Sequence, residues 1–411
     1  MSLLVKNIGQ LVGIDESGRT RISGKEMDKI GMLGNAWLLT EGDRIKNYGT
    51  MDSMPTVHDA EIIDADDGWL FPSFCDSHTH IVYAGSREQE FLDKIKGLSY
   101  EEIAQNGGGI LNSADRLHET SEEELYRQAM ERIDEIVSMG TGLVEIKSGY
   151  GLTLEDELKI LRVIKRIREN APLEVRATFL GAHAVGRAYK GRQAEYVEHV
   201  CNEMIPAVAK EGLADFVDVF CDKGFFTVEE TAKIMEIGAR YGLRAKIHAN
   251  ELAISGGVEI GVKHNALSVD HLESMGEEQI EALHNSNTMP TLLPGCAFFL
   301  GITYPPARRM IDSGLAVALA SDFNPGTAPS GNMRFVTSLA SIKMKMTPAE
   351  ALNAATLNSA CAIGESKNYG SITRGKVANF YITKPLPSLA YMPYAHQTPV
   401  IKEIILKGKH I

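Results

Sequence analysis

The sequence is poor in cysteine and tryptophan, and its charge has the wrong sign for a polyanionic partner. Only 5 of its 411 residues are cysteine and 2 are tryptophan, and no two cysteines form a C-x-x-C pair. The sequence therefore gives no support to a disulfide framework or to a zinc site of paired thiolates. Acidic residues outnumber basic ones by 54 to 42, so the formal net charge is -12. Because nucleic acids and anionic membranes attract basic faces, we expect neither as a partner.

Long apolar runs are also missing. The first 13 residues contain no apolar stretch of the length found in a secretory signal. The most apolar later segment, residues 289–304, is interrupted by prolines and glycines. It is shorter than the roughly 20 residues that span a bilayer. We therefore expect a cytoplasmic protein with no membrane partner.

The middle of the chain alternates between strand-like and helix-like patterns. Segments such as 154–169, 195–211, 228–241 and 276–284 have apolar residues at helical spacing and a charged opposite face. They separate short apolar runs, which are typical of strands buried on both faces. Eight such runs occur, at residues 69–71, 143–146, 174–180, 216–220, 243–247, 267–269, 289–293 and 315–320. This alternation predicts an α/β fold, a closed parallel (β/α)8 barrel, although an open doubly wound sheet is the alternative.

Both ends of the chain have a different pattern. Short β segments with turn residues between them occur at residues 2–13, 36–49 and 57–65, and again at 370–383 and 400–407. We expect both termini to combine in one small β-sandwich beside the barrel. The predicted division assigns residues 1–68 and 366–411 to the sandwich, and residues 69–365 to the barrel.

Polar side chains follow nearly every predicted barrel strand, where the active sites of such barrels lie. His78 and His80 stand two residues apart on a strand, so both imidazoles point to one side. His248 and Asp322 end the fifth and eighth strands. Three imidazoles and one carboxylate suit a single Zn²⁺ or Fe ion that keeps a position open for water. The sequence therefore predicts one metal ion per chain.

Two acid–base candidates lie next to these predicted ligands, and one ligand is a third. Glu251 follows His248 by three residues, so it can reach a water molecule on the metal and move its proton. His271 ends the sixth strand and is a second candidate, and Asp322 itself can share the proton transfer. The alternatives are structural: Glu251 as an acid at a helix N-terminus, and His271 as a buried imidazole bonded to backbone.

The motifs at these strand ends resemble the amidohydrolase superfamily, which implies a metal-dependent barrel hydrolase with a β-sandwich from both termini. The more specific stretches are DSHTHIVYAGSRE (76–88), NGGGI (106–110), EIKSGYGL (145–152), TFLGAHA (178–184) and SDFNPG (321–326). They resemble the branch of that superfamily that hydrolyses 4-imidazolone-5-propionate to N-formimidoyl-glutamate in histidine degradation. The similarity covers essentially the whole chain, including GSITRGKVAN at 370–379.

The resemblance implies a role for each matching residue. It makes His78, His80, His248 and Asp322 the metal ligands and puts Glu251 and His271 at the reacting centre, where Glu251 also touches the substrate. Its remaining substrate- and product-binding positions are Arg87, Tyr100, Tyr150, His183, Asn324, Gly326 and Thr327. A carboxylate-tailed substrate suits a bidentate arginine and phenolic donors, although Arg87 could instead form an ion pair with Glu88 or Glu90.

Other functions stay open at this stage. A deaminase of a purine, pyrimidine or related heterocycle would use the same ligands and the same His-x-x-Glu spacing, but it would have no use for an Arg–Tyr–Tyr carboxylate site. A non-catalytic barrel would be expected to lack one of these residues, and none is missing. By family analogy a dinuclear site would need a lysine at the end of the fourth strand, where Cys221 and Asp222 stand. A homodimer is compatible with the sequence.

Overall fold

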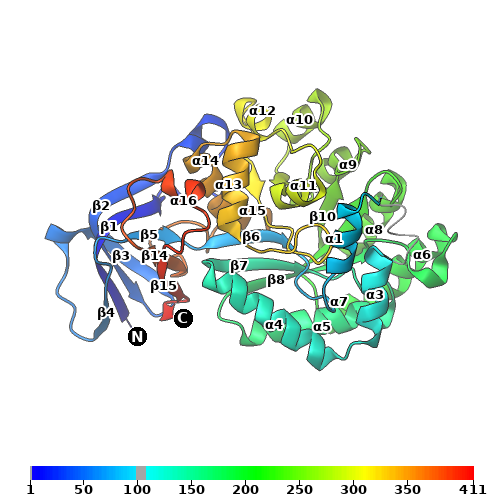
Figure 1. The fold of residues 1–411 in the computed structure, drawn as a ribbon, viewed down its shortest axis with the longest axis horizontal. Coiled ribbons are helices and arrows are strands. Elements are labelled where there is room, and N and C mark those ends of the chain that lie inside the picture. The colour runs from blue at the N-terminus through cyan, green and yellow to red at the C-terminus, as the bar shows by residue number, and fades with distance from the viewer. Residues whose placement is uncertain (1, 99–107) are drawn as a thin grey trace.

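The computed structural model describes residues 2–98 and 108–411, which form a helix-covered barrel with a second sheet at one end (Figure 1). All neighbouring strands of the barrel pair in parallel. In order they are β6 Phe74–Thr79, β7 Thr141–Lys147, β8 Glu174–Ala182, β9 Phe216–Cys221, β10 Arg244–Ala249, β11 Ser268–His271, β12 Met289–Leu292 and β13 Ala318–Leu319.

The barrel closes at the carboxyl ends of its first and last strands. There the amide of His80 donates to the carbonyl of Phe323 at 2.8 Å, and the amide of Asp322 donates to the carbonyl of His78 at 3.0 Å. The predicted (β/α)8 barrel is confirmed. Its closure brings the H-x-H segment beside Asp322, although about 240 residues separate them in the sequence.

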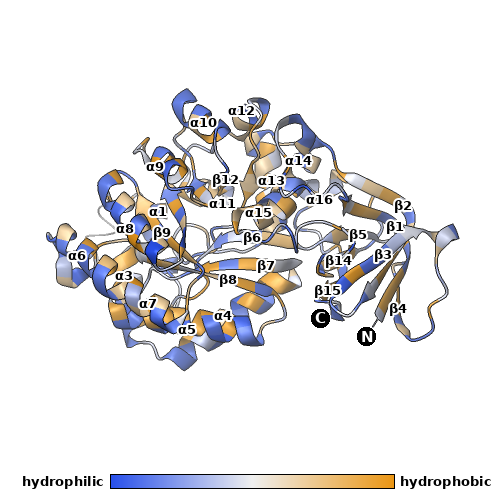
Figure 2. Ribbon diagram, turned by 180° about the vertical axis from the view of Figure 1, so that it is seen from behind, coloured by the Kyte–Doolittle hydropathy of each residue, from blue (hydrophilic) through white to orange (hydrophobic). Residues whose placement is uncertain are grey.

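Helices surround this sheet and bury its outer face. Every residue of β6, β7 and β9 is buried, as expected for parallel strands with helices outside and packed side chains inside. The helices present banded apolar and polar faces (Figure 2). They are α1 Glu88–Ile95, α3 Ile110–Glu119, α4 Glu122–Ser138, α5 Leu154–Asn170, α6 Gln193–His199, α7 Ile205–Glu211, α8 Val228–Arg240, α9 Gly257–Lys263, α10 Glu277–His284, α11 Pro294–Leu300, α12 Ala307–Asp312, α13 Met333–Met344, α14 Pro348–Asn353, α15 Ser359–Ala362 and α16 Tyr391–Tyr394. None of the described helices is long and apolar enough to cross a membrane.

The second sheet takes strands from both ends of the chain, as the sequence predicts. Its order is β16-β15-β14-β5-β1-β2-β3, and β4 also pairs with β1. It has its own buried core, which includes Val5, Leu38 and Phe380. The strands are β1 Ser2–Ile14, β2 Gly31–Glu41, β3 Arg44–Thr50, β4 Ala60–Asp64, β5 Trp69–Pro72, β14 Phe380–Thr383, β15 Ile401–Leu406 and β16 Lys409–His410. The division of the chain at residues 68 and 366 stays a prediction.

One strand assignment is wrong. We expected residues 69–71 to open the barrel, but β5 lies in the terminal sheet, where Phe71 pairs with Tyr381 and Leu70 pairs with Leu11. The first barrel strand is instead β6, which begins at Phe74. Both runs are short, fully buried and separated only by Ser73, so their apolar pattern gives no information about which sheet they join.

A buried asparagine connects an N-terminal segment to the residue that precedes β13. Asn358 is fully buried, and its side chain bonds to the amide and the carbonyl of Ile22 and to the carbonyl of Val317, at 2.8–2.9 Å. Asn358→Ala would leave these backbone groups without partners. We expect a loss of about 2–4 kcal/mol in unfolding free energy. Urea denaturation measures it against Asn285→Ala, an exposed control, and equal midpoints for the two variants would contradict the assignment.

Candidate active site

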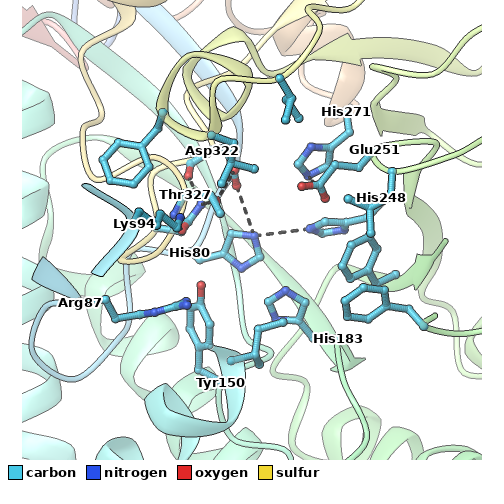
Figure 3. A pocket seen from close by; sticks show the side chains of 18 of the residues that line it. His80, Arg87, Lys94, Tyr150, His183, His248, Glu251, His271, Asp322 and Thr327 are labelled. Carbon is cyan, nitrogen blue, oxygen red and sulfur yellow. Dashed lines mark hydrogen bonds and ion pairs between the residues drawn. The ribbon is translucent and has the colours of Figure 1, made fainter. Parts of the chain in front are cut away.

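The carboxyl ends of the barrel strands surround a cavity of about 580 Å³ (Figure 3). Most of the site residues predicted from the sequence line it: His80, Arg87, Tyr150, His183, His248, Glu251, His271, Asp322, Asn324 and Thr327. His78 is fully buried beside His80 and His248, and Gly326 lies against Arg87. Tyr100 lies outside the described residues.

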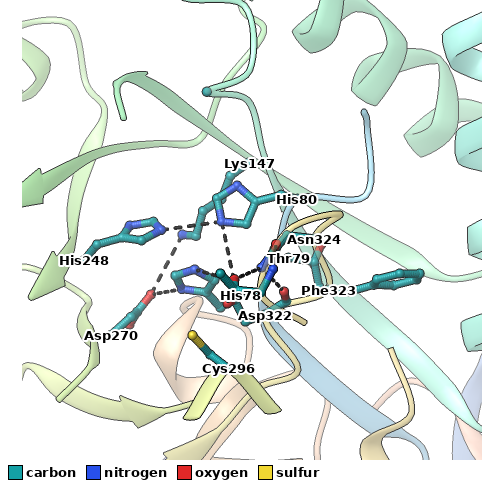
Figure 4. Close-up of polar contacts among 12 residues, drawn as sticks. His78, Thr79, His80, Lys147, His248, Asp270, Cys296, Asp322, Phe323 and Asn324 are labelled. Atoms are coloured by element: carbon teal, nitrogen blue, oxygen red, sulfur yellow. Dashed lines mark hydrogen bonds and ion pairs between the residues drawn. The ribbon is translucent and has the colours of Figure 1, made fainter. Parts of the chain in front are cut away.

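The four predicted metal ligands converge at the base of the cavity. The Nε2 atoms of His78 and His80 lie 3.6 and 3.7 Å from Oδ1 of Asp322. Nε2 of His80 lies 3.5 Å from Nε2 of His248 (Figure 4). Ligand atoms that share a tetrahedral metal with bonds of about 2.0–2.2 Å lie roughly 3.3–3.6 Å apart, so these three distances are close to those around a common ion. The ligand atoms of His78, His80 and Asp322 all lie within 4.8 Å of one another, and His248 forms a second such group with His78 and His271.

The protonation of these imidazoles also suits a metal. Burial, and then the nearby positive charge of Lys147, lower the pKa of His78 well below its ordinary value. Burial and His183 do the same to the pKa of His80. Neutral imidazoles offer a lone pair, and the buried Nε2 atom of His78 has no hydrogen-bond partner among the described residues. The donor set therefore fits a divalent cation.

Buried carboxylates orient two of these imidazoles from behind. Oδ2 of Asp270 lies 2.7 Å from Nδ1 of His78, and Oδ2 of Asp218 lies 3.0 Å from Nδ1 of His248. Lys147, also fully buried, donates to Asp218 at 2.8 Å and to Glu145 at 2.7 Å. The hydrogen bond to Asp270 holds Nδ1 of His78 as the protonated nitrogen and directs its Nε2 toward a metal. Asp218 also accepts from the backbone amide of His248 at 3.1 Å, so it contacts this residue through both its ring and its backbone.

Glu251 and His271 form a largely buried pair beside the imidazoles of His78 and His248. Oε2 of Glu251 lies 3.7 Å from Nε2 of His271, and Oε1 lies 3.7 Å from the thiol of Cys296. Burial raises the pKa of Glu251, and the charge of His271 opposes the rise. Burial lowers the pKa of His271, but Glu251, Cys296 and Glu273 outweigh it and raise the pKa well above its ordinary value. The pair can therefore hold a proton near neutral pH.

Two of the site residues adopt a left-handed backbone. The φ angles of His271 and Asp322 are 85° and 57°, in a region that side-chain-bearing residues seldom occupy. Hydrogen bonds from their immediate surroundings hold these turns: Leu272 donates to the Ala249 carbonyl at 3.1 Å, and Asp322 donates to His78. Strained backbone of this kind clusters at functional sites, where it directs side chains off the strand ends.

Arg87 lies at the far side of the cavity from His271 (Figure 3). Its Nε and Nη2 atoms donate to the two oxygens of Glu90 at 2.9 and 2.5 Å, so the ion pair considered from the sequence does form. It is mostly buried, however, and Arg87 lines the cavity. A Cβ atom at Gly326 would lie 2.2 Å from Nη1 of Arg87. The loop that follows Asp322 therefore lies against the guanidinium, and a side chain at position 326 would require the guanidinium to move.

The 324–327 loop and His183 complete the wall. Oδ1 of Asn324 accepts from the amides of Gly326 and Thr327, both at 2.8 Å, and the Thr327 hydroxyl lies 3.4 Å from Oδ2 of Asp322. His183 stacks on His80, and its Nδ1 lies 3.0 Å from the Gly149 carbonyl. Burial and the charge of His248 lower the pKa of His183 to about 3. A neutral His183 with Nδ1 protonated presents Nε2 as an acceptor.

Sequence reasoning missed several contributors. Asp218, Glu145 and Lys147 are charged residues inside apolar strands, and that contrast was an available signal. Lys94 lines the cavity from α1, a position with no distinguishing local pattern. The Cys296 thiol contacts Glu251, and nothing near Cys296 in the sequence indicates this contact.

Curated relatives match the chain over its full length. An imidazolonepropionase of Christiangramia forsetii is 54% identical over 411 residues, and the match covers 100% of both chains. An imidazolonepropionase of Geobacillus kaustophilus is 40% identical, with 99% of this chain and 97% of the relative covered.

Solved structures share the fold at low identity. E. coli guanine deaminase has a TM-score of 0.76 at 13% identity, covering 100% of this chain and 99% of the other. A zinc-bound adenosine deaminase from Xanthomonas campestris has a TM-score of 0.68 at 15% identity, covering 99% and 92%. These two likenesses concern the fold alone.

Residues 69–411 match the amidohydrolase family. The chain therefore belongs to the amidohydrolase family and, within it, to the imidazolonepropionases.

Proposed function

We propose that this chain holds one Zn²⁺ or Fe ion at His78, His80, His248 and Asp322 and hydrolyses 4-imidazolone-5-propionate to N-formimidoyl-glutamate. The observation that carries the proposal is the pairing, in one cavity, of the ligand cluster with a largely buried arginine. The full-length relatives support the same reaction. We also propose that the protein is cytoplasmic. That it forms a homodimer stays a prediction.

The cavity orients such a substrate by its two chemically different ends. Arg87 would bind the propionate carboxylate through its guanidinium, beside the backbone of Gly326. Lys94 on the same wall adds a second positive group. Tyr150 and His183 line the space between Arg87 and His248, where the ring would lie (Figure 3). The acceptor Nε2 of His183 suits a ring N–H.

The reaction adds water to the ring carbonyl and breaks the adjacent C–N bond. A divalent metal in the His78–Asp322 cluster supplies Lewis acidity, which makes water more acidic and polarises a carbonyl group. Glu251 takes a proton from the water and delivers it to the departing ring nitrogen. Protonated His271 donates to the oxygen on which negative charge develops. The carbonyl carbon becomes a carboxylate, and the freed nitrogen becomes the NH of the formimidoyl group.

A heterocycle deaminase is the rival within the same family. The structural neighbours that carry such names share only the fold, at 13–15% identity. Arg87 distinguishes the two chemistries, because a neutral base offers it no carboxylate. The proposed function is therefore the ring hydrolysis rather than a deamination.

A coupled assay tests the proposal directly. Purified protein is analysed for bound metal, and loss of imidazolone propionate, generated in place by urocanase, is followed by absorbance. We expect hydrolysis by the metal-loaded protein and N-formimidoyl-glutamate as the product by mass spectrometry. No hydrolysis, or turnover of guanine or cytosine that Arg87→Ala leaves unchanged, would overturn it.

Arg87→Lys keeps the positive charge but loses the planar fork. We expect KM for imidazolone propionate to rise roughly tenfold to a hundredfold, because a charge-assisted bidentate contact contributes about 1.5–3 kcal/mol. Steady-state kinetics measure the effect. Arg187→Lys is the matched control, since its ion pair with Asp115 is exposed. An equal KM for both variants would argue against a carboxylate site at Arg87.

Glu251→Gln removes the proton acceptor and preserves the shape of the side chain. We expect kcat to fall by about 10²–10⁴, while the metal content stays at the wild-type level. Metal analysis and single-turnover kinetics separate these two effects. The exposed variant Glu229→Gln serves as control. Wild-type kcat in Glu251→Gln would remove Glu251 from the mechanism.

Metal affinity should depend on pH through Asp322. Burial raises the pKa of this carboxyl to about 6, so protons compete with the metal below that pH. The flanking imidazoles have lowered pKa values and stay neutral there. We expect the affinity to weaken by about tenfold per pH unit below pH 6. Chelator competition between pH 5 and 8 measures it, and a flat profile would exclude Asp322 as a ligand.

A further inference from the structure

Three further ligand-type side chains meet beside the proposed metal cluster: Glu251, His271 and Cys296. Their ligand atoms all lie within 4.8 Å of one another. The carboxylate of Glu251 lies 3.7 Å from the Cys296 thiol through one oxygen, and 3.7 Å from Nε2 of His271 through the other. Cys296, at the start of α11, adds a sulfur that the four proposed ligands lack.

The two contacts of Glu251 differ in kind: the Cys296 thiol donates a sulfur hydrogen bond to Oε1 at 3.7 Å, whereas the contact with His271 is too long for a hydrogen bond. An N–H···O hydrogen bond spans about 2.7–3.2 Å, so the Glu251–His271 contact at 3.7 Å exceeds that range. Ligands bound to Zn²⁺ at about 2.0–2.3 Å are separated by roughly 3.3–3.7 Å along a tetrahedron's edges. Small side-chain movements would therefore bring all three atoms onto one ion.

Glu273 provides an independent observation. Neither of its carboxylate oxygens has a hydrogen-bond partner among the described residues, and both are buried. Oε2 lies 3.7 Å from Nδ1 of His271, behind the imidazole as seen from Glu251. Histidines that bind zinc usually have a carboxylate hydrogen-bonded in that position, and a small movement of Glu273 would bring it into such contact with His271.

The ligand types select a thiophilic cation, and the cavity gives it a route. Thiolate and imidazole together favour Zn²⁺ over Mg²⁺ or Ca²⁺, which prefer oxygen. Glu251 and His271 line the cavity, so an ion that enters it reaches them before it reaches the buried Cys296. Figure 4 draws Cys296 below His78 and Asp322.

We propose that Glu251, His271 and Cys296 form a second, inhibitory binding site for a thiophilic divalent cation such as Zn²⁺, filled when metal exceeds one ion per chain. The inhibition rests on the proposed function, because the ion occupies the two groups assigned to proton transfer. Binding releases the Cys296 thiol proton and the proton of His271 to solvent. Excess metal then stops turnover while the His78–Asp322 site stays filled.

Titration of the apoprotein with Co²⁺ tests the site directly. The three imidazoles and the carboxylate of the proposed catalytic site contain no sulfur, so a near-ultraviolet thiolate-to-cobalt charge-transfer band reports Cys296 alone. We expect the first equivalent to restore turnover without that band. The second should bring the band and lower turnover on the order of a hundredfold, the usual contribution of general acid–base catalysis.

Variants identify the thiol. Cys296→Ser and Cys296→Ala should lack the band, and each should keep its own one-equivalent rate when more Co²⁺ is added. Cys201→Ala, a buried thiol elsewhere in the barrel, should behave as wild type. No band in the wild type at saturating Co²⁺, or a band that persists in both Cys296 variants, would overturn the proposal. The band is read without substrate, so a failure of the proposed function would be distinguishable from a failure of this site.

Discussion

The buried contacts from Asp270 to His78 and from Asp218 to His248 are the constraint on which the rest of the site depends. An imidazole ligand must present one chosen nitrogen at a fixed angle, and a carboxylate on the other nitrogen achieves this. Burying such carboxylates costs free energy of desolvation unless positive groups lie close enough to pair with them. Lys147 lies within 3.8 Å of both, and Lys246 lies 3.6 Å from Asp270. The barrel interior under the cavity is thus a charge network rather than an apolar layer.

The network explains why charged residues occupy fully buried strands. Glu145, Lys147, Asp218, Lys246 and Asp270 are all completely buried, with three carboxyl groups against two ammonium groups. A site with this excess of negative charge suits a cation at its upper surface, where the imidazoles emerge. The same arrangement lowers the pKa of His78 through burial and Lys147 and so preserves its lone pair for a metal. The fold, the buried charges and the ligand types therefore all favour a bound cation at this site.

Much of this architecture could be predicted from the sequence. Alternation of strand and helix indicated the barrel, and the rule that polar residues gather at the carboxyl ends of strands singled out His78, His183, His248, His271 and Asp322, which line or underlie one cavity. These residues could be predicted because the position of a residue on a strand determines the direction of its side chain.

What could not be predicted depends on contacts distant in sequence. The β5 strand joins the terminal sheet because of partners more than 300 residues away, such as Tyr381. Arg87 forms the ion pair with Glu90 and still lines the cavity, which only the three-dimensional arrangement could reveal. Cys296, near the start of α11, contacts Glu251, and the sequence around Cys296 gives no indication of that contact.

X-ray absorption spectroscopy of protein loaded with one Zn²⁺ per chain tests most directly whether three imidazoles and one carboxylate hold the catalytic ion. We expect scattering from three imidazoles and no sulfur neighbour; fewer imidazoles, or a sulfur at this loading, would contradict the proposed ligand set.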